Sequence, residues 1–243
     1  MTIVDAAAVG SIFLVAATVQ VVGGFGFAIV AVPLLTFVLS PATAVQCAIL
    51  VEMPLILFVS LHEAGWVHKR AALQLGGWSL VGVPLGVITM RALQGRVLSI
   101  VLGILVLALA LTVRRPIRSA PAAPWSARLG GALSGLLMGV SAMSGPPLVA
   151  ALRHFDLQPR ELRATASAVF VLQGSVAMAI LLATSSLGHR VPVAAALGVT
   201  GVAAGWLVGN PTFARVDAHR FASIVILLLV ISALATIVRA VVV

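Results

Sequence analysis

The sequence predicts an all-α polytopic membrane protein made of two inverted-topology repeats, each with a broken or re-entrant helix pair followed by three transmembrane helices. Three observations predict this fold class. The chain is strongly apolar, two apolar stretches half a chain apart are interrupted in the same way, and basic residues gather in alternate loops. We expect residues 1–113 and 129–243 to form the two repeats, with a cytoplasmic linker at 114–128.

The composition of the chain excludes an ordinary soluble protein. Of its 243 residues, 61% are hydrophobic and 9% are charged, and the mean hydropathy is +1.20. Continuous apolar runs such as 100–111 favour membrane helices over the alternating strands of a β-barrel. The formal net charge of +9 is spread over short loops, so it indicates membrane topology rather than nucleic-acid binding.

Eight apolar stretches are long enough to be membrane helices or pairs of shorter helices. Two of these helices should begin at Pro41 and Pro159, because the missing N–H of proline costs little at the first helical position. The stretches lie at about 5–39, 42–61, 72–90, 97–113, 129–152, 164–183, 192–209 and 221–240.

The first and fifth stretches are interrupted by glycine and proline at matching positions. In both, a proline stands seven positions after a glycine: Pro33 after Gly26 in the first stretch, and Pro146 after Gly139 in the fifth. Interrupted hydrophobic segments at corresponding positions of two halves are a pointer to the substrate site of a secondary transporter.

Other matches between the halves predict a duplication, and the loop charges predict an inversion. If each broken segment returns the chain to the side from which it came, eleven Lys and Arg residues face one side and four the other. The positive-inside rule makes the richer side cytoplasmic, which places both termini outside and inverts the second repeat. The matched positions are Pro41 with Pro159, Gly82 with Gly201, Gly86 with Gly205, and Arg96 with Arg220.

The residues around both breaks resemble those of a known family, the sulfite exporter TauE/SafE family of membrane permeases. Gly23–Leu35 is similar to its first signature, Gly135–Val149 to its second, and Arg163–Thr165 to the polar start of its following helix. The resemblance covers essentially the whole chain. It implies a secondary carrier of sulfur-containing or related organic anions, such as sulfite, sulfoacetate or other sulfonates, coupled to protons.

The two breaks supply the first candidate substrate-binding residues. A helix that starts inside the membrane directs N–H groups and a partial positive charge toward its ligand, which suits an anion. Glycine lets the backbone come close, and proline fixes the start of the returning helix. Alternatively, these small residues only allow close helix packing. The candidates are Gly24, Gly26, Ser141, Ser144, Gly145 and Pro146.

Polar residues within the apolar stretches complete the candidate site. Gln46, Thr165 and Gln173 could offer neutral hydrogen bonds to the anion, or they could only satisfy bonds between helices. Glu52 is the only carboxylate deep in an apolar stretch, where an ionised group costs several kcal/mol. We therefore expect Glu52 to be protonated or paired. A role in proton coupling competes with a structural role.

A cluster of basic residues follows the second break. It contains Arg153, His154, Arg160 and Arg163. These side chains could attract anions to a cytoplasmic vestibule. The alternative is that they are ordinary topology-determining charges that contact lipid headgroups.

The sequence thus predicts an anion exporter of the bacterial cytoplasmic membrane, and two other classes stay open. An intramembrane enzyme would need a metal-ligand pair or paired aspartates, which no apolar stretch contains, and a structural membrane protein gives no reason for matched breaks. We expect a small anion, the lipid bilayer and protons as partners, and no nucleic acid, metal or other cofactor. A homodimer could form through glycine-rich outer faces at Gly198, Gly201, Gly205 and Gly209.

Overall fold

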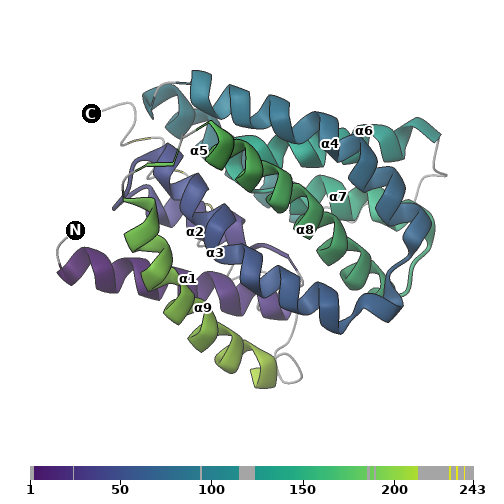
Figure 1. Cartoon of the computed structure of the whole chain (residues 1–243), viewed down its shortest axis with the longest axis horizontal. Helices are drawn as coiled ribbons and strands as arrows, with labels where there is room; N and C mark the ends of the chain where they lie inside the picture. Colours follow the sequence, from purple (N-terminus) through teal and green to yellow (C-terminus); the bar gives the residue numbers. More distant parts are fainter. Residues whose placement is uncertain are drawn as a thin grey trace. The chain divides into compact units, whose positions relative to one another are not determined.

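The computed structural model describes residues 3–23, 25–93, 95–114, 124–184, 187–188, 190–212 and the single positions 230, 234 and 238, and in these it consists of helices joined by short turns and loops. Figure 1 shows the helices in chain order. The elements are α1 (Ile3–Gly23), α2 (Phe27–Leu35), α3 (Pro41–His62), η1 (Ala64–Trp66), α4 (Lys69–Ala92), α5 (Gly95–Arg114), α6 (Pro124–Ser141), α7 (Gly145–Leu152), η2 (Arg153–Phe155), α8 (Pro159–Ala183) and α9 (Val191–Thr212). The predicted stretch at 221–240 lies outside the continuously described residues.

Helix length separates the membrane-spanning candidates from two short helices. Among the described residues, α1, α3, α4, α8 and α9 are long and apolar enough to cross a membrane. By contrast, α2 has 9 residues and α7 has 8 residues. At the usual helical rise, both are about 12–14 Å long, which is less than half of a hydrocarbon core of about 30 Å.

The helices that follow the short ones begin where the sequence predicts. Pro41 opens α3 and Pro159 opens α8. A capping box also fixes the start of α8, because the Gln158 N–H donates to a Glu161 carboxylate oxygen at 3.0 Å. These starts place Gln46 and Thr165 in the second turns of α3 and α8.

The described helices divide into two compact units, and neither unit is a continuous half of the sequence. The first unit contains α1, α2, α3 as far as Glu52, α5 and α9. The second contains the rest of α3, from Met53, together with α4, α6, α7 and α8. The helix α4 from the first half of the chain thus belongs with α6–α8, and α9 from the second half belongs with α1 and α2.

In the second unit, α4 lies along α6 at a backbone-to-backbone distance that only glycine permits (Figure 1). A Cβ atom at Gly82 would clash with the backbone of Ala132 and Leu136, and one at Gly86 would clash with the backbone of Leu136 and Gly139. Small residues at a crossing allow this close approach, which is the usual basis of helix association in lipid.

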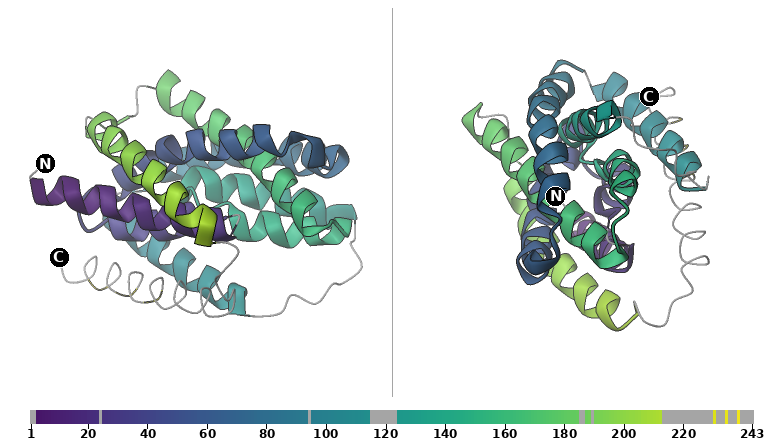
Figure 2. Two further views of the ribbon diagram at one scale, coloured as in Figure 1. Left: turned by 90° about the horizontal axis from the view of Figure 1, so that it is seen from below. Right: turned by 90° about the vertical axis from the view of Figure 1, so that its right-hand side faces the viewer.

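In the first unit, α1 and α9 make the corresponding close crossing (Figure 2). A Cβ atom at Gly201 would clash with the backbone of Gly10, and one at Gly205 would clash with the backbone of Leu14. The expectation that these α9 glycines form an outer face is therefore wrong, because they are buried against α1. The homodimer itself stays a prediction, without these glycines to support it.

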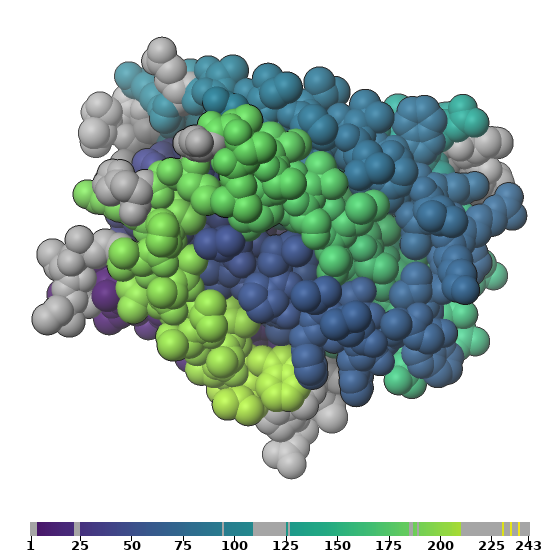
Figure 3. All heavy atoms as spheres, in the orientation of Figure 1, coloured from purple at the N-terminus to yellow at the C-terminus, as the bar shows by residue number. Residues whose placement is uncertain are grey.

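Large apolar side chains are exposed on the long helices. Figure 3 shows α9 as a yellow-green band on the visible face, and Val193, Val199 and Leu207 of this helix are exposed. On α4, Leu73 and Ile88 are exposed as well. Exposed apolar side chains on long helices suit contact with lipid tails.

Candidate functional site

The first interruption lies between α1 and α2, and an amide side chain from α1 spans it. Gly26 has a φ of 116°, a left-handed conformation that favours glycine. Immediately after it, the Phe27 N–H donates to Oε1 of buried Gln20 at 3.0 Å. Gln20 thus satisfies one of the N–H groups that a helix start leaves without a backbone partner. Gly24 lies outside the described residues.

Gln20 is not among the site residues expected from the sequence. The signal that could have found it is an isolated amide in an otherwise apolar helix, seven residues before the first residue of the next helix. An uncharged polar side chain at that position is costly in lipid unless it has a partner.

The second interruption lies between α6 and α7 and is held by Ser141. The Ser141 hydroxyl donates to the Leu137 carbonyl at 2.8 Å and accepts the Met143 N–H at 3.3 Å. Between them, Ala142 has a φ of 62°, a left-handed conformation that is uncommon for a residue with a Cβ. The Ser141 hydroxyl therefore stabilises the turn, and its expected role in substrate binding stays a prediction.

Three buried polar groups join α8 and α6 to the start of α7. The Gln173 Nε2 group donates to Ser134 Oγ at 2.9 Å. Ser134 Oγ in turn donates to the carbonyl oxygen of Ser144, the N-cap residue of α7, at 2.9 Å. Gln173 and Ser134 are fully buried. The structure therefore brings predicted Gln173 to the second break, through Ser134, which the sequence analysis missed.

The first turn of α7 offers fewer N–H groups than an ordinary helix start. Gly145 opens the helix and is followed by Pro146 and Pro147, and proline has no N–H to donate. Ser144 makes no side-chain cap bond. An anion at this end of α7 would meet the helix dipole but few backbone donors, so it would depend on nearby side chains.

Gln46 and Thr165 each accept a hydrogen bond near the start of another helix. Gln46 Oε1 accepts the Gly188 N–H at 3.0 Å, shortly before α9. Thr165 Oγ1 accepts the His68 N–H at 2.9 Å, just before α4. These bonds tie segments of the chain together, as the structural reading of both residues proposed. They do not test a role in substrate binding.

Glu52 lies midway along α3, the helix that runs from Pro41 to His62. Its side chain is buried, with 7% of its surface exposed. Within the described part of the chain, no hydrogen bond or ion pair to Glu52 is found. A carboxyl group in this position is strongly disfavoured as an anion unless it gains a partner.

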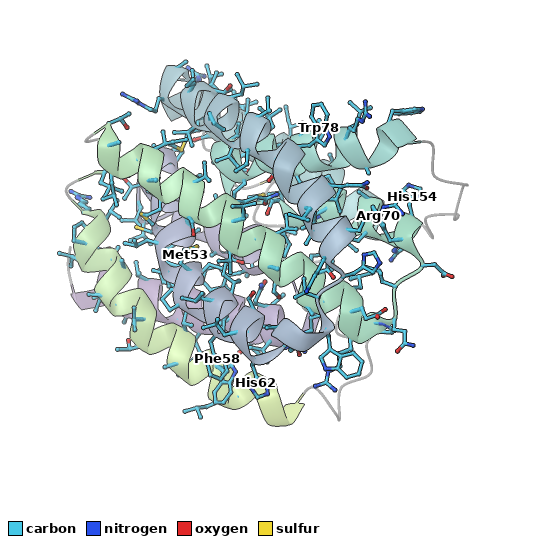
Figure 4. All side chains as sticks on the ribbon, turned by 45° about the vertical axis from the view of Figure 1, so that its right-hand side comes forward. Met53, Phe58, His62, Arg70, Trp78 and His154 are labelled. Atoms are coloured by element: carbon cyan, nitrogen blue, oxygen red, sulfur yellow. The ribbon has the colours of Figure 1, made fainter. Side chains whose placement is uncertain are left out.

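Two of the basic residues after the second break hold the loop between α3 and α4. The Arg160 guanidinium lies 4.5 Å from the centre of the Trp66 ring, and Arg163 Nε lies 3.8 Å from Glu63 Oε2. Figure 4 places His154, from the same basic cluster, at the end of the second unit where Arg70 of α4 lies. Arg160 and Arg163 therefore have structural partners, whatever their effect on anions.

Taken together, the long apolar helices, the two short helices and the buried polar groups define a multi-pass membrane protein. The described residues contain no group of three or more His, Cys, Asp or Glu side chains placed to hold a metal ion. The chain belongs to the sulfite exporter TauE/SafE family, whose sequence profile matches residues 9–236. Members of this family are membrane transporters. Comparison with curated proteins gives no match, and comparison with solved structures gives none.

Proposed function

We propose that this protein is a secondary carrier that exports small sulfur-containing anions, such as sulfite, sulfoacetate or other sulfonates, across the bacterial cytoplasmic membrane. Family membership and five membrane-length helices support a transporter. The proposal that the substrate is an anion rests on the two helix starts that follow the interruptions. A carrier of this kind is not an enzyme, because the anion leaves unchanged.

The observation that carries this proposal is that α2 and α7 both begin after an interruption and are both too short to cross a bilayer. In such a broken helix pair, the positive end of a helix dipole lies within the membrane, where it can hold an anion without a buried lysine. Transporters bind their substrates at discontinuous helices of this type. Gly26 and Ser144 are the N-cap residues of these two helices, one in each unit, and each would lie beside an anion bound at its own helix start.

Equivalent packing of matched glycines supports the inverted repeats. Gly82 and Gly86 of α4 lie against α6, the first helix of the second repeat, while Gly201 and Gly205 of α9 lie against α1, the first helix of the first repeat. In this arrangement the fourth helix of each repeat, α4 or α9, packs against the first helix of the other repeat. With the asymmetry of the loop charges, this arrangement favours outside termini and a cytoplasmic linker.

Glu52 is the proposed proton-coupling residue. It is buried in α3 and has no partner within the described residues. A carboxyl group that binds and releases a proton during the transport cycle would link export to the proton gradient. In the alternative, Glu52 is a protonated structural group, and its replacement by glutamine leaves coupling intact.

The direct test is flux of radiolabelled sulfite and sulfoacetate in proteoliposomes. A carrier gives saturable flux of each anion, and each anion competitively inhibits the flux of the other. The carrier also releases the same molecule that it takes up. Liposomes without protein are the control. Flux equal to that of empty liposomes would contradict the proposal and favour a structural protein, while release of a chemically altered anion would favour an intramembrane enzyme.

A further inference from the structure

One buried hydrogen-bond acceptor near the second break is left without a partner. Gln173 on α8 is fully buried, and its Oε1 atom has no hydrogen bond in the described part of the chain. Leaving a buried acceptor unpaired costs free energy, so such atoms in native proteins usually meet a ligand or an ordered water.

The neighbouring hydrogen bonds fix which end of the Gln173 amide is unpaired. Ser134 Oγ carries one hydrogen, which it donates to the Ser144 carbonyl. It can therefore only accept from Gln173, and the atom that faces it must be the Nε2 donor. The free end of the amide is then the carbonyl oxygen. This orientation is the reverse of what a fully deprotonated anion needs, because such an anion can only accept hydrogen bonds.

The start of α7 also favours a ligand that brings its own hydrogen-bond donor. Pro146 and Pro147 remove two N–H groups from its first turn, so the site is poor in donors. A site with few donors and a free acceptor favours an anion of low charge that brings a hydrogen of its own.

We propose that Gln173 Oε1 accepts a hydrogen bond from the transported anion, so that the second break selects singly charged oxyanions that carry their own hydrogen, such as hydrogen sulfite, over sulfonates and dianions. Ser134 is a positioning residue that holds the amide in this orientation. This inference rests on the proposed function and names the protonation state of its substrate.

The test compares the binding of hydrogen sulfite with that of methanesulfonate, a sulfonate of the same charge that has no hydrogen to donate. Binding to the purified full-length protein is measured by calorimetry at mildly acidic pH, where dissolved sulfite is mainly the singly protonated ion. Wild type should bind hydrogen sulfite about tenfold more tightly than methanesulfonate, as expected for one hydrogen bond to a buried acceptor.

Replacement Gln173→Met keeps the size of the side chain and removes the acceptor. It should weaken hydrogen sulfite binding about tenfold and leave methanesulfonate binding nearly unchanged. Leu172→Met, at the exposed neighbouring position, is the control and should change neither affinity. If Gln173→Met does not fold, Ser134→Ala provides the second test, because it frees the amide to rotate and should reduce the same preference.

Other outcomes overturn the inference. If wild type binds methanesulfonate as tightly as hydrogen sulfite, or if Gln173→Met weakens both equally, Gln173 donates to the anion or only supports the fold. In both cases the anion carrier itself stands. If wild type binds neither ligand and also shows no flux, the proposed function fails and this inference fails with it.

Discussion

Gln20 Oε1 accepts the hydrogen bond of the Phe27 N–H at 3.0 Å and thereby joins α1 to the first residue of α2 across the interruption at Gly26. The bond is buried. It satisfies one N–H at the helix start, and the next N–H groups of the first turn stay directed toward the break. A helix start that is held in this way is rigid without any charged side chain.

Replacement Gln20→Leu should destabilise the first unit. The Phe27 N–H would be left unpaired in a buried position, which costs about 1–3 kcal/mol. Thermal unfolding in detergent measures the loss. Gln74→Leu, at an exposed position on α4, is the matched control and should leave the unfolding temperature unchanged. Equal unfolding temperatures for Gln20→Leu and wild type would show that the bond does not stabilise α2.

Alanine at the glycine crossings should be destabilising in both units. Gly82→Ala would force α4 away from the backbone of α6, and Gly201→Ala would force α9 away from α1. Overpacking of this kind costs about 1–3 kcal/mol. A Cβ at Gly77 meets nothing within 4 Å, so Gly77→Ala on α4 is the control. Similar stability of all three variants in detergent would contradict the close crossings.

Replacement Thr165→Val should loosen the start of α4. The valine has the shape of threonine but cannot accept the His68 N–H, which would cost about 1–2 kcal/mol. Hydrogen exchange at the His68 amide, followed by mass spectrometry, measures the change directly. Thr200→Val on an exposed face of α9 serves as the isosteric control. Unchanged protection at His68 would argue against the bond.

Replacement Glu52→Gln should separate anion exchange from proton coupling. Glutamine has the shape of a protonated glutamate but cannot release a proton, so exchange of sulfite between compartments at equal pH should persist. Uptake or release driven by a pH gradient should fall to the level of liposomes without protein. A variant that keeps the wild-type response to the gradient would assign Glu52 to the structure instead.

Much of the helix plan could be predicted from residues with strong local preferences. Proline at the first helical position locates α3 and α8, and the left-handed backbone at Gly26 needs a glycine. The hydrogen-bond partners of Gln20 and Ser134 could not be predicted in this way, because they depend on which backbone group the fold brings opposite each side chain. A serine or glutamine in an apolar helix looks the same in the sequence whether or not it has such a partner.

The sequence also did not predict that α4 packs with α6–α8 and that α9 packs with α1 and α2. The matched glycines Gly82 and Gly201 indicate that both helices make close crossings, but a glycine does not specify which helix it meets. Its surface fits any small-residue partner. For that reason the glycines of α9 were expected on an outer face, although α1 covers them.

The most direct test of the central claim, that each helix break binds the transported anion, is protection of single cysteines placed at the breaks. Phe25→Cys and Ser144→Cys are made with Cys47→Ala, which removes the chain's only cysteine. Maleimide labelling in vesicles should slow about tenfold at both positions when sulfoacetate is present at about ten times its Kd. Gly65→Cys, in the exposed η1 turn, should label at the same rate with and without sulfoacetate. Unchanged labelling at both breaks under saturating sulfoacetate would contradict the account.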